Sequence, residues 1–141
     1  MKERNFLIYT DGGARGNPGP AAAATVIEET AGNARLICGK YLGVNTNNFA
    51  EYQGVILAYE TLSKVKNLNP QATTLKFFLD STLVVNQLNL LFKVKNPVLI
   101  GLLGKIKSFE KDYKKVSYTY IPREKNWQAD KLVNETLDKR P

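Results

Sequence analysis

Apolar residues recur along the chain with two spacings, one typical of buried strands and the other typical of amphipathic helices. Short apolar or alternating runs predict strands at residues 6–9, 21–28, 35–42, 74–79 and 116–121. Apolar positions three and four residues apart predict helices at residues 48–66, 82–90, 98–111 and 126–139. The turn sequence Thr30-Ala31-Gly32-Asn33 lies between the second and third strands, which predicts a hairpin and an antiparallel meander of the first three strands.

The resulting order of elements is βββαβααβα. A meander followed by strand–helix crossovers predicts an α/β fold, with a mixed five-stranded sheet flanked by helices. One buried face of the longest predicted helix is indicated by Gly54, Leu57, Ala58, Thr61, Leu62 and Val65. The sequence contains no repeats, low-complexity tracts or linkers, so we expect residues 1–141 to form one domain.

The composition of the chain restricts the chemistry available to it. It contains no histidine and a single cysteine, Cys38, which excludes Ser-His and Cys-His catalysis, a structural zinc site and an internal disulfide. Catalysis must then come from carboxylates, amides, hydroxyls, lysines or a hard, oxygen-liganded metal such as Mg²⁺. The formal net charge of +7 favours a polyanionic partner.

The sequence also predicts a cytoplasmic protein. No apolar run approaches the ~20 residues of a membrane span, and the first residues lack the apolar core of a signal peptide. A lone cysteine is consistent with a reducing compartment. We therefore expect no membrane partner.

Four acidic residues fall at the ends of predicted elements. Asp11 ends the first strand, Glu51 opens the longest helix, Asp80 ends the fourth strand, and Asp130 lies in the first turn of the last helix. If the first and fourth strands are parallel neighbours, Asp11 and Asp80 emerge side by side at the usual ligand crevice of such sheets. Four acids around one crevice repel one another unless cations lie between them. The arrangement suits two Mg²⁺ ions bound through carboxylates, waters and a substrate phosphate.

Each acid also has a purely structural interpretation. Asp11 precedes a glycine, as in an ordinary turn. Glu51 follows Asn48 at the spacing of a capping box, and Asp80 can cap the helix expected to begin at residue 82. Asp130 is favoured near a helix N-terminus by the helix dipole. The spacing alone leaves these alternatives open.

Four local strings favour the catalytic interpretation. Residues 9–19 read YTDGGARGNPG, residues 46–52 TNNFAEY, residues 79–81 LDS and residues 122–130 PREKNWQAD. In this order, and with the same βββαβααβα layout, they resemble the four signatures of the type 1 ribonucleases H along the whole chain. The resemblance implies a metal-dependent endonuclease that cuts the RNA strand of an RNA–DNA hybrid and leaves 5′-phosphate and 3′-hydroxyl ends.

The resemblance also assigns individual residues. The catalytic and metal-binding set falls on Asp11, Glu51, Asp80 and Asp130, which would hold two Mg²⁺ ions, for which Mn²⁺ can substitute. One ion would activate the attacking water and the other would stabilise the leaving 3′-oxygen. The residues expected to contact the nucleic acid are Ala14, Gly16, Asn17, Thr46 and Asn48 along the groove, Thr82 beside the scissile region, and Lys93, Lys95 and Arg123.

The chain departs from the family pattern in two places. Many members carry a histidine in the loop before the last aspartate, where this chain has Arg123, Glu124 and Lys125. The long basic protrusion of some relatives is reduced to the segment around Lys93 and Lys95. We therefore expect a compact member of the family, with looser hybrid binding, a slower product step, retained chemistry and no separate hybrid-binding domain at either end.

Three other functions fit parts of the sequence. The same fold serves nucleases that cut DNA or double-stranded RNA, although the Asn-Pro-Gly turn and the Thr-Asn-Asn run favour the ribonuclease H branch. A non-catalytic hybrid-binding module is disfavoured by the intact set of acids, which would only weaken binding to phosphate. A cationic scaffold or membrane-surface protein is disfavoured because the basic residues are scattered along the chain. We expect a monomer whose partner is an RNA–DNA hybrid.

Overall fold

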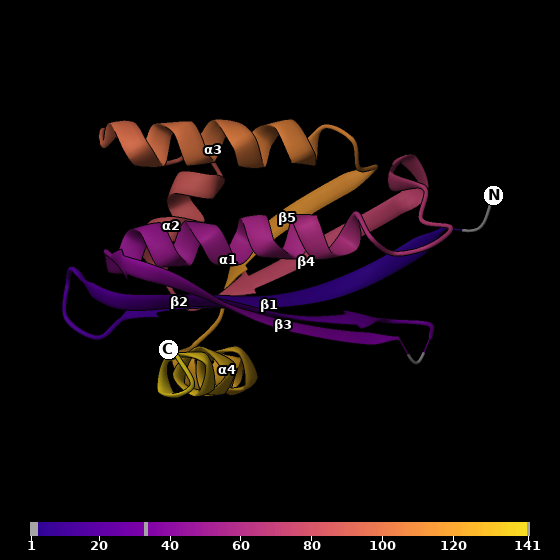
Figure 1. Ribbon diagram of the computed structural model, residues 1–141. Coiled ribbons are helices and arrows are strands. Elements are labelled where there is room, and N and C mark those ends of the chain that lie inside the picture. The colour runs from indigo at the N-terminus through magenta and orange to yellow at the C-terminus, as the bar shows by residue number, and fades with distance from the viewer. Residues whose placement is uncertain (1–2, 33, 141) are drawn as a thin grey trace.

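The first three strands run back and forth and the next two join them through helices, so that one mixed sheet forms (Figure 1). The computed structural model describes residues 3–32 and 34–140. The strands are β1 (Arg4–Ala14), β2 (Gly19–Glu29), β3 (Arg35–Asn45), β4 (Thr73–Leu79) and β5 (Lys115–Tyr120). The helices are α1 (Asn47–Leu62), α2 (Thr82–Leu88), α3 (Pro97–Glu110) and α4 (Trp127–Asp138), with the 3₁₀ turns η1 (Pro70–Ala72) and η2 (Arg123–Asn126).

The strand order in the sheet is β3-β2-β1-β4-β5. β1, β2 and β3 pair in antiparallel fashion, whereas β4 is parallel to both β1 and β5. The predicted α/β fold with a mixed five-stranded sheet is therefore confirmed. The predicted turn between β2 and β3 includes Asn33, which lies outside the described residues.

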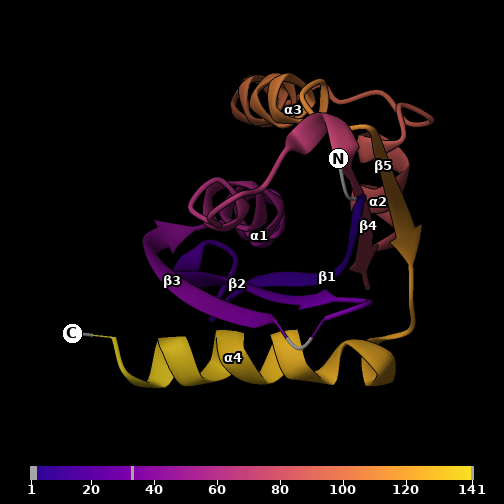
Figure 2. The ribbon, with the colours of Figure 1, turned by 90° about the vertical axis from the view of Figure 1, so that its right-hand side faces the viewer.

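Helices cover both faces of the sheet (Figure 2). α1 lies on one face with α3 packed on it, and α4 crosses the opposite face over β1, β2 and β3. β2 therefore has a helix on each side, and its central residues Ala21, Ala22, Ala23 and Ala24 are fully buried. Their small side chains leave room for both helices to pack closely on the strand.

Helix α1 is buried more completely than the single apolar face predicted from its sequence. Tyr52 and Tyr59, outside that face, are among the most buried large side chains of the described residues. The reason is that α3 encloses α1 from the side away from the sheet. α1 also ends at Leu62, before the predicted end at residue 66, and the chain then turns through Asn67, which has a left-handed φ of 61°.

Two glycines allow α1 to lie directly on β1. A Cβ atom at Gly12 would come within 2.1 Å of the backbone carbonyl of Ala50, and one at Gly54 would come within 2.7 Å of the backbone oxygen of Asp11. Both distances are far below van der Waals contact, so any side chain at these positions must push the helix off the strand. The contact therefore sets the height of Glu51 above Asp11.

We expect Gly12→Ala to lower the free energy of unfolding by about 3 kcal/mol, because overpacking against rigid backbone costs energy of this order. Gly104 in α3 is the matched control, since a Cβ atom there meets nothing within 4 Å. Gly104→Ala should stabilise the protein by up to about 1 kcal/mol. Urea denaturation in metal-free buffer measures both changes, and a Gly12→Ala chain as stable as the wild type would contradict the close contact.

Candidate active site

Asp11 and Asp80 lie just beyond the end of the parallel pairing between β1 and β4. The pairing between β1 and β4 ends at Tyr9 and Phe78, and each aspartate follows two residues later. The prediction that Asp11 ends β1 is wrong, because the strand remains paired with β2 as far as Ala14. Asp11 is therefore held in a strand and not in a turn.

Glu51 reaches the same place from α1. The N-cap of this helix is Thr46, whose side chain accepts a hydrogen bond of 3.2 Å from the backbone N–H of Phe49. This finding overturns the alternative in which Asn48 and Glu51 form a capping box. The side chain of Glu51 is buried, with 8% of the residue exposed.

The capping alternative for Asp80 is overturned as well. Ser81 is the N-cap of α2, and its Oγ accepts a hydrogen bond of 3.2 Å from the backbone N–H of Val84. The Asp80 carboxylate instead accepts a hydrogen bond of 3.0 Å from the side-chain amide of Asn126. Its position at the edge of the sheet is therefore not explained by helix capping.

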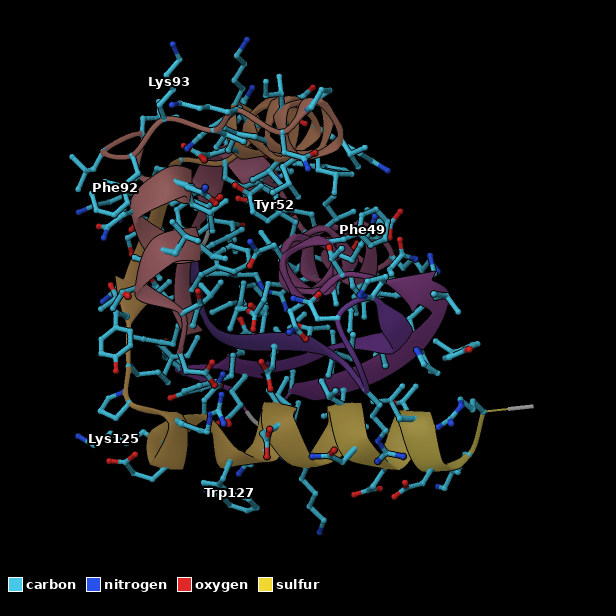
Figure 3. The ribbon with its side chains drawn as sticks, turned by 90° about the vertical axis from the view of Figure 1, so that its left-hand side faces the viewer. Phe49, Tyr52, Phe92, Lys93, Lys125 and Trp127 are labelled. Carbon is cyan, nitrogen blue, oxygen red and sulfur yellow. The ribbon has the colours of Figure 1, made fainter. Side chains whose placement is uncertain are left out.

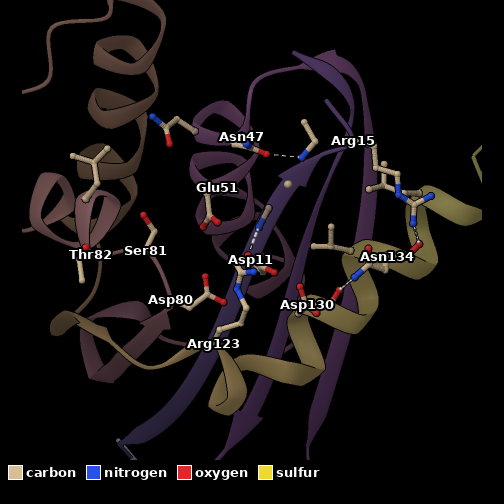
Figure 4. Close-up of a pocket in the computed structure, with 17 residues that line it drawn as sticks. Asp11, Arg15, Asn47, Glu51, Asp80, Ser81, Thr82, Arg123, Asp130 and Asn134 are labelled. Carbon is tan, nitrogen blue, oxygen red and sulfur yellow. Dashed lines mark hydrogen bonds between the residues drawn. The ribbon is translucent and has the colours of Figure 1, made fainter. Parts of the chain in front are cut away.

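The three acids converge on one point (Figure 4). Asp11, Glu51 and Asp80 each offer a carboxylate oxygen, and these oxygens all lie within 4.8 Å of one another. Asp130 projects from α4 into the same cleft, which has a volume of about 480 Å³, but it lies outside this closest group of described residues. The cleft thus brings all four predicted acids together, with three in a tight cluster.

Burial and mutual repulsion make the carboxyls of Asp11 and Glu51 difficult to ionise. Burial, followed by the charge of Asp80, raises the pKa of Asp11 to about 7. Burial, followed by the charges of Asp11 and Asp80, raises the pKa of Glu51 well above its ordinary value. The Oε2 atom of Glu51 is buried and has no hydrogen-bond partner among the described residues. A cation placed among these oxygens would offset both unfavourable effects.

Two arginines line the cleft together with the acids. Arg123, the first residue of η2, points toward the carboxylates in Figure 4, and its charge lowers the pKa of Glu51, although burial has the larger, opposite effect. Arg15 lies on the other side of Asp130 and pairs with Asp138 of α4 at 2.7 Å. Of these two arginines, Arg123 is therefore the one that faces the acid cluster.

The predicted substrate-binding residues are divided between two adjoining hollows and the surface. The residues of this set that line the acid cleft are Ala14, Asn48, Thr82 and Arg123. The residues that line a second hollow, of about 370 Å³, are Asn17, Thr46 and Asn48. Asn48 belongs to both, so the two hollows adjoin at the start of α1.

The other three predicted contacts lie outside these hollows. Gly16 lies in the turn between β1 and β2 with a φ of +93°, a backbone conformation that favours glycine. Lys93 and Lys95 are exposed in the segment between α2 and α3. Figure 3 shows Lys93 on the side of the molecule away from α4, and neither lysine lines the acid cleft.

Sequence reasoning missed two amides beside the predicted groove. Asn47 joins the start of α1 to the turn between β1 and β2. Its side-chain Oδ1 accepts a hydrogen bond of 2.8 Å from the backbone N–H of Ala14. Its backbone N–H donates a hydrogen bond of 3.0 Å to Oδ1 of Asn17. Asn96, the N-cap of α3, lines the second hollow. Asn47 lies within the TNNFAEY string, and Asn96 directly precedes Pro97, a residue common at the start of a helix. Both asparagines could therefore have been identified from the sequence.

Comparison with known proteins agrees with this geometry. A family model described as "Reverse transcriptase-like" matches residues 9–136. The chain is 35% identical over 133 residues to the bifunctional protein Rv2228c of Mycobacterium tuberculosis, a match that covers 94% of this chain and 35% of that protein. The chain therefore spans about a third of the length of this curated relative.

Solved structures of similar proteins match along nearly the whole chain. LC11-RNase H1, isolated from compost by a metagenomic approach, has a TM-score of 0.87 and 40% identity, covering 99% of this chain and 98% of its own. The same protein in complex with an RNA/DNA hybrid has a TM-score of 0.84 and 40% identity, covering 95% and 97%. RNase H1 of the archaeon Halobacterium salinarum has a TM-score of 0.87 and 32% identity, covering 96% and 99%.

The strand order, the helices on both faces and the acid cluster at the carboxyl edge define a protein with the ribonuclease H-like fold. The matches over most of the chain narrow this class further. The chain belongs to the type 1 ribonuclease H family.

In metal-free buffer, the protein should lose stability as the pH rises from about 4 to about 7. Over this range the folded chain still holds the proton of Asp11, whose pKa is raised to about 7, whereas the unfolded chain has released it at about pH 3.9. A folded state that binds more protons than the unfolded state becomes less stable as the pH rises.

Urea unfolding midpoints at a series of pH values, with chelator or with saturating Mg²⁺, measure this effect. Asp11→Asn should make the metal-free profile less steep, leaving the part due to the raised pKa of Glu51, and Mg²⁺ should remove the loss in the wild type. Asp112→Asn, which removes an exposed carboxylate outside the cleft, is the matched control and should keep the wild-type slope. A wild-type midpoint that rises between these pH values without metal would contradict the electrostatic picture of the cleft.

Proposed function

We propose that this chain is a ribonuclease H that hydrolyses the RNA strand of RNA–DNA hybrids as an endonuclease, leaving 5′-phosphate and 3′-hydroxyl ends. Residues 1–141 would form a single catalytic domain. The observation that carries the proposal is the convergence of Asp11, Glu51 and Asp80 to within 4.8 Å at the carboxyl edge of the sheet. The similar LC11-RNase H1, which shares this fold, has been solved in complex with an RNA/DNA hybrid.

The donor atoms of the cleft fit a hard divalent cation. Carboxylate oxygens are the ligands that Mg²⁺ prefers, and the buried Oε2 atom of Glu51 has no partner among the described residues. We assign Asp11, Glu51 and Asp80 to one ion, and Asp11 with Asp130, whose charge also raises the pKa of Asp11, to a second. Bound Mg²⁺, or Mn²⁺ in its place, would supply activation of the attacking water and stabilisation of the leaving oxygen.

Neutral hydrogen-bonding groups would hold the hybrid beside the acids. We assign this role to Ala14, Asn17, Thr46 and Asn48, which line the two hollows, and to Gly16 in the turn between β1 and β2. The hydroxyl of Thr46 accepts from the backbone N–H of Phe49, so its own proton remains available to a sugar or phosphate oxygen. Amides and hydroxyls suit the RNA strand, because a 2′-hydroxyl is both a donor and an acceptor.

Charged groups would contact the phosphates. Arg123 lines the cleft and can hold two phosphate oxygens at once, while Thr82 lines the same cleft beside the scissile region. Lys93 and Lys95 are exposed beyond α2, and we assign them to the backbone of the DNA strand. A formal net charge of +7 supports a polyanionic substrate.

The remaining assignments concern the setting of the reaction. We propose that the protein acts in the cytoplasm as a monomer, and that it is a compact ribonuclease H, with the short segment around Lys93 and Lys95 in place of a long basic protrusion. In the described part of the chain, no helix has both the length and the apolar character required to cross a membrane.

Cleavage should be limited to the RNA strand of the hybrid and should require a divalent cation. The test incubates end-labelled RNA/DNA, RNA/RNA, DNA/DNA and single-stranded RNA with Mg²⁺, Mn²⁺ or chelator, and resolves the products on one gel. Comparable cutting of DNA/DNA or RNA/RNA would assign the chain to another nuclease branch of the fold. Binding of hybrid without cutting in any metal would indicate a non-catalytic binding module.

Asp80→Asn should reduce hybrid cleavage by at least about 100-fold, because loss of one ligand charge removes several kcal/mol of metal-derived stabilisation. The amide keeps the shape of the side chain, so hybrid binding in a gel-shift assay should be retained. Asp112→Asn removes the same charge outside the cleft and is the matched control. Near-wild-type cleavage by Asp80→Asn would exclude a ligand role for this residue.

A further inference from the structure

Asn126 is a buried amide that connects the two strands bearing Asp11 and Asp80. It is the last residue of η2, and 1% of it is exposed. Its Nδ2 donates a hydrogen bond of 2.9 Å to the backbone oxygen of Thr10 and one of 3.0 Å to Oδ2 of Asp80. Thr10 directly precedes Asp11. One amide group therefore contacts Asp80 itself and the residue next to Asp11.

The place of this amide matters because the backbone pairing of the two strands has already ended. β1 and β4 are paired as far as Tyr9 and Phe78. Beyond that point β1 continues beside β2, while β4 leads through Ser81 into α2. The side chain of Asn126 therefore bridges the two strands in the interval where Asp11 and Asp80 stand and where backbone hydrogen bonds no longer fix their separation.

The chemistry of the two partners determines which way the amide faces. A backbone carbonyl and a carboxylate are acceptors only, so the NH₂ end of Asn126 must face them. The Oδ1 atom of Asn126 is consequently buried without a hydrogen-bond partner among the described residues. A buried acceptor without a donor is unfavourable, and the two donated bonds must outweigh that loss for the arrangement to persist.

We propose that Asn126 is a positioning residue of the metal centre: it holds Asp80 in the orientation that a cation requires and fixes its separation from Asp11. By binding Oδ2 of Asp80 it leaves the other carboxylate oxygen for the cation. The inference rests on the proposed function, because it concerns the same carboxylates. Groups that orient metal ligands typically change metal affinity about 10–100-fold when they are removed.

The test is a double-mutant cycle in Mn²⁺ affinity, measured by titration calorimetry without nucleic acid. The four proteins are the wild type, Asn126→Ala, Asp80→Asn and the double variant. Asn126→Ala should raise the Kd for Mn²⁺ by about 10-fold in the wild-type background. It should raise it by less than about twofold in the Asp80→Asn background, because the side chain that it orients has lost its ligand function.

Two further variants separate positioning from loss of fold. Asn89 is a matched control, because its Nδ2 donates to the backbone oxygen of Tyr118 at 3.0 Å and joins α2 to β5 outside the acid cleft. Asn89→Ala should lower the unfolding midpoint and leave the Kd for Mn²⁺ unchanged. Asn126→Ser keeps a small polar side chain that is too short to reach both acceptors, and it should weaken Mn²⁺ binding as Asn126→Ala does.

Each outcome decides the question. An unchanged Kd in the Asn126 variants, an equal loss in the Asp80→Asn background, or failure of both Asn126 variants to fold would assign Asn126 a structural role only. With cleavage as readout, the Mn²⁺ concentration for half-maximal rate should rise by the same factor as the Kd, while KM for the hybrid stays constant. A wild type that shows the coupling in Mn²⁺ affinity but cuts no hybrid would refute the proposed function and uphold the inference.

Discussion

The geometry of this protein depends on the direct contact between α1 and β1. Gly12 and Gly54 face the backbone of Ala50 and Asp11, and the absence of two Cβ atoms lets the helix lie on the strand. Asp11 directly precedes Gly12, and Glu51 directly follows Ala50. The same few positions therefore serve both the packing of the helix and the chemistry of the site. Alanines in β2 have a similar effect on the opposite face, where Ala22 and Ala24 pack with Val133 and Leu137 of α4. α4 in turn brings Asp130 to the cleft.

The polar groups of the interior fall into two sets with opposite character. In one set, Tyr59 and Tyr118 share a hydrogen bond of 2.7 Å, and Tyr118 also donates to Glu110 of α3 at 3.0 Å. These groups are paired, and they connect α1, β5 and α3. In the other set, Glu51 and Asn126 keep buried atoms without a partner among the described residues. Unpaired buried polar atoms are rare and call for an explanation. Those of Glu51 and Asn126 adjoin the acids, where a cation or a substrate can supply the missing interaction, whereas Thr10 and Thr25 keep unpaired hydroxyl oxygens at paired positions of β1 and β2.

Much of the fold can be predicted from local patterns, because a helix or strand that buries one face has apolar residues at a regular spacing in its sequence. The ends of elements do not follow in this way. Asp11 was predicted to end its strand because glycines follow it, yet pairing with β2 carries the strand to Ala14. Asn48 and Asp80 were open as possible caps, because the chain offers several polar candidates at each helix start, and only geometry selects Thr46 and Ser81.

The acids of the candidate site could be predicted from the sequence, but the side chains that position these acids could not. The acids lie in strings that resemble a known family and at the ends of predictable elements. The contacts of Asn126 cannot be read in the same way, because its partners Thr10 and Asp80 stand 116 and 46 residues away in the chain. Their common contact exists only once β1, β4 and η2 meet, so tertiary structure alone defines it.

The composition also limits how protons can move in the cleft. The chain contains no histidine, and the side chain of Arg123, which faces the acids, offers hydrogen-bond donors and no acceptor. Its role must then be electrostatic. In the free protein burial keeps the pKa of Glu51 raised, and the charge of Arg123 only partly offsets this effect; in the proposed complex the same guanidinium would be available to phosphate oxygens. In the proposed hydrolysis, a released proton would therefore pass to solvent, to the substrate phosphate or to a carboxyl group of the cleft that holds Asp11.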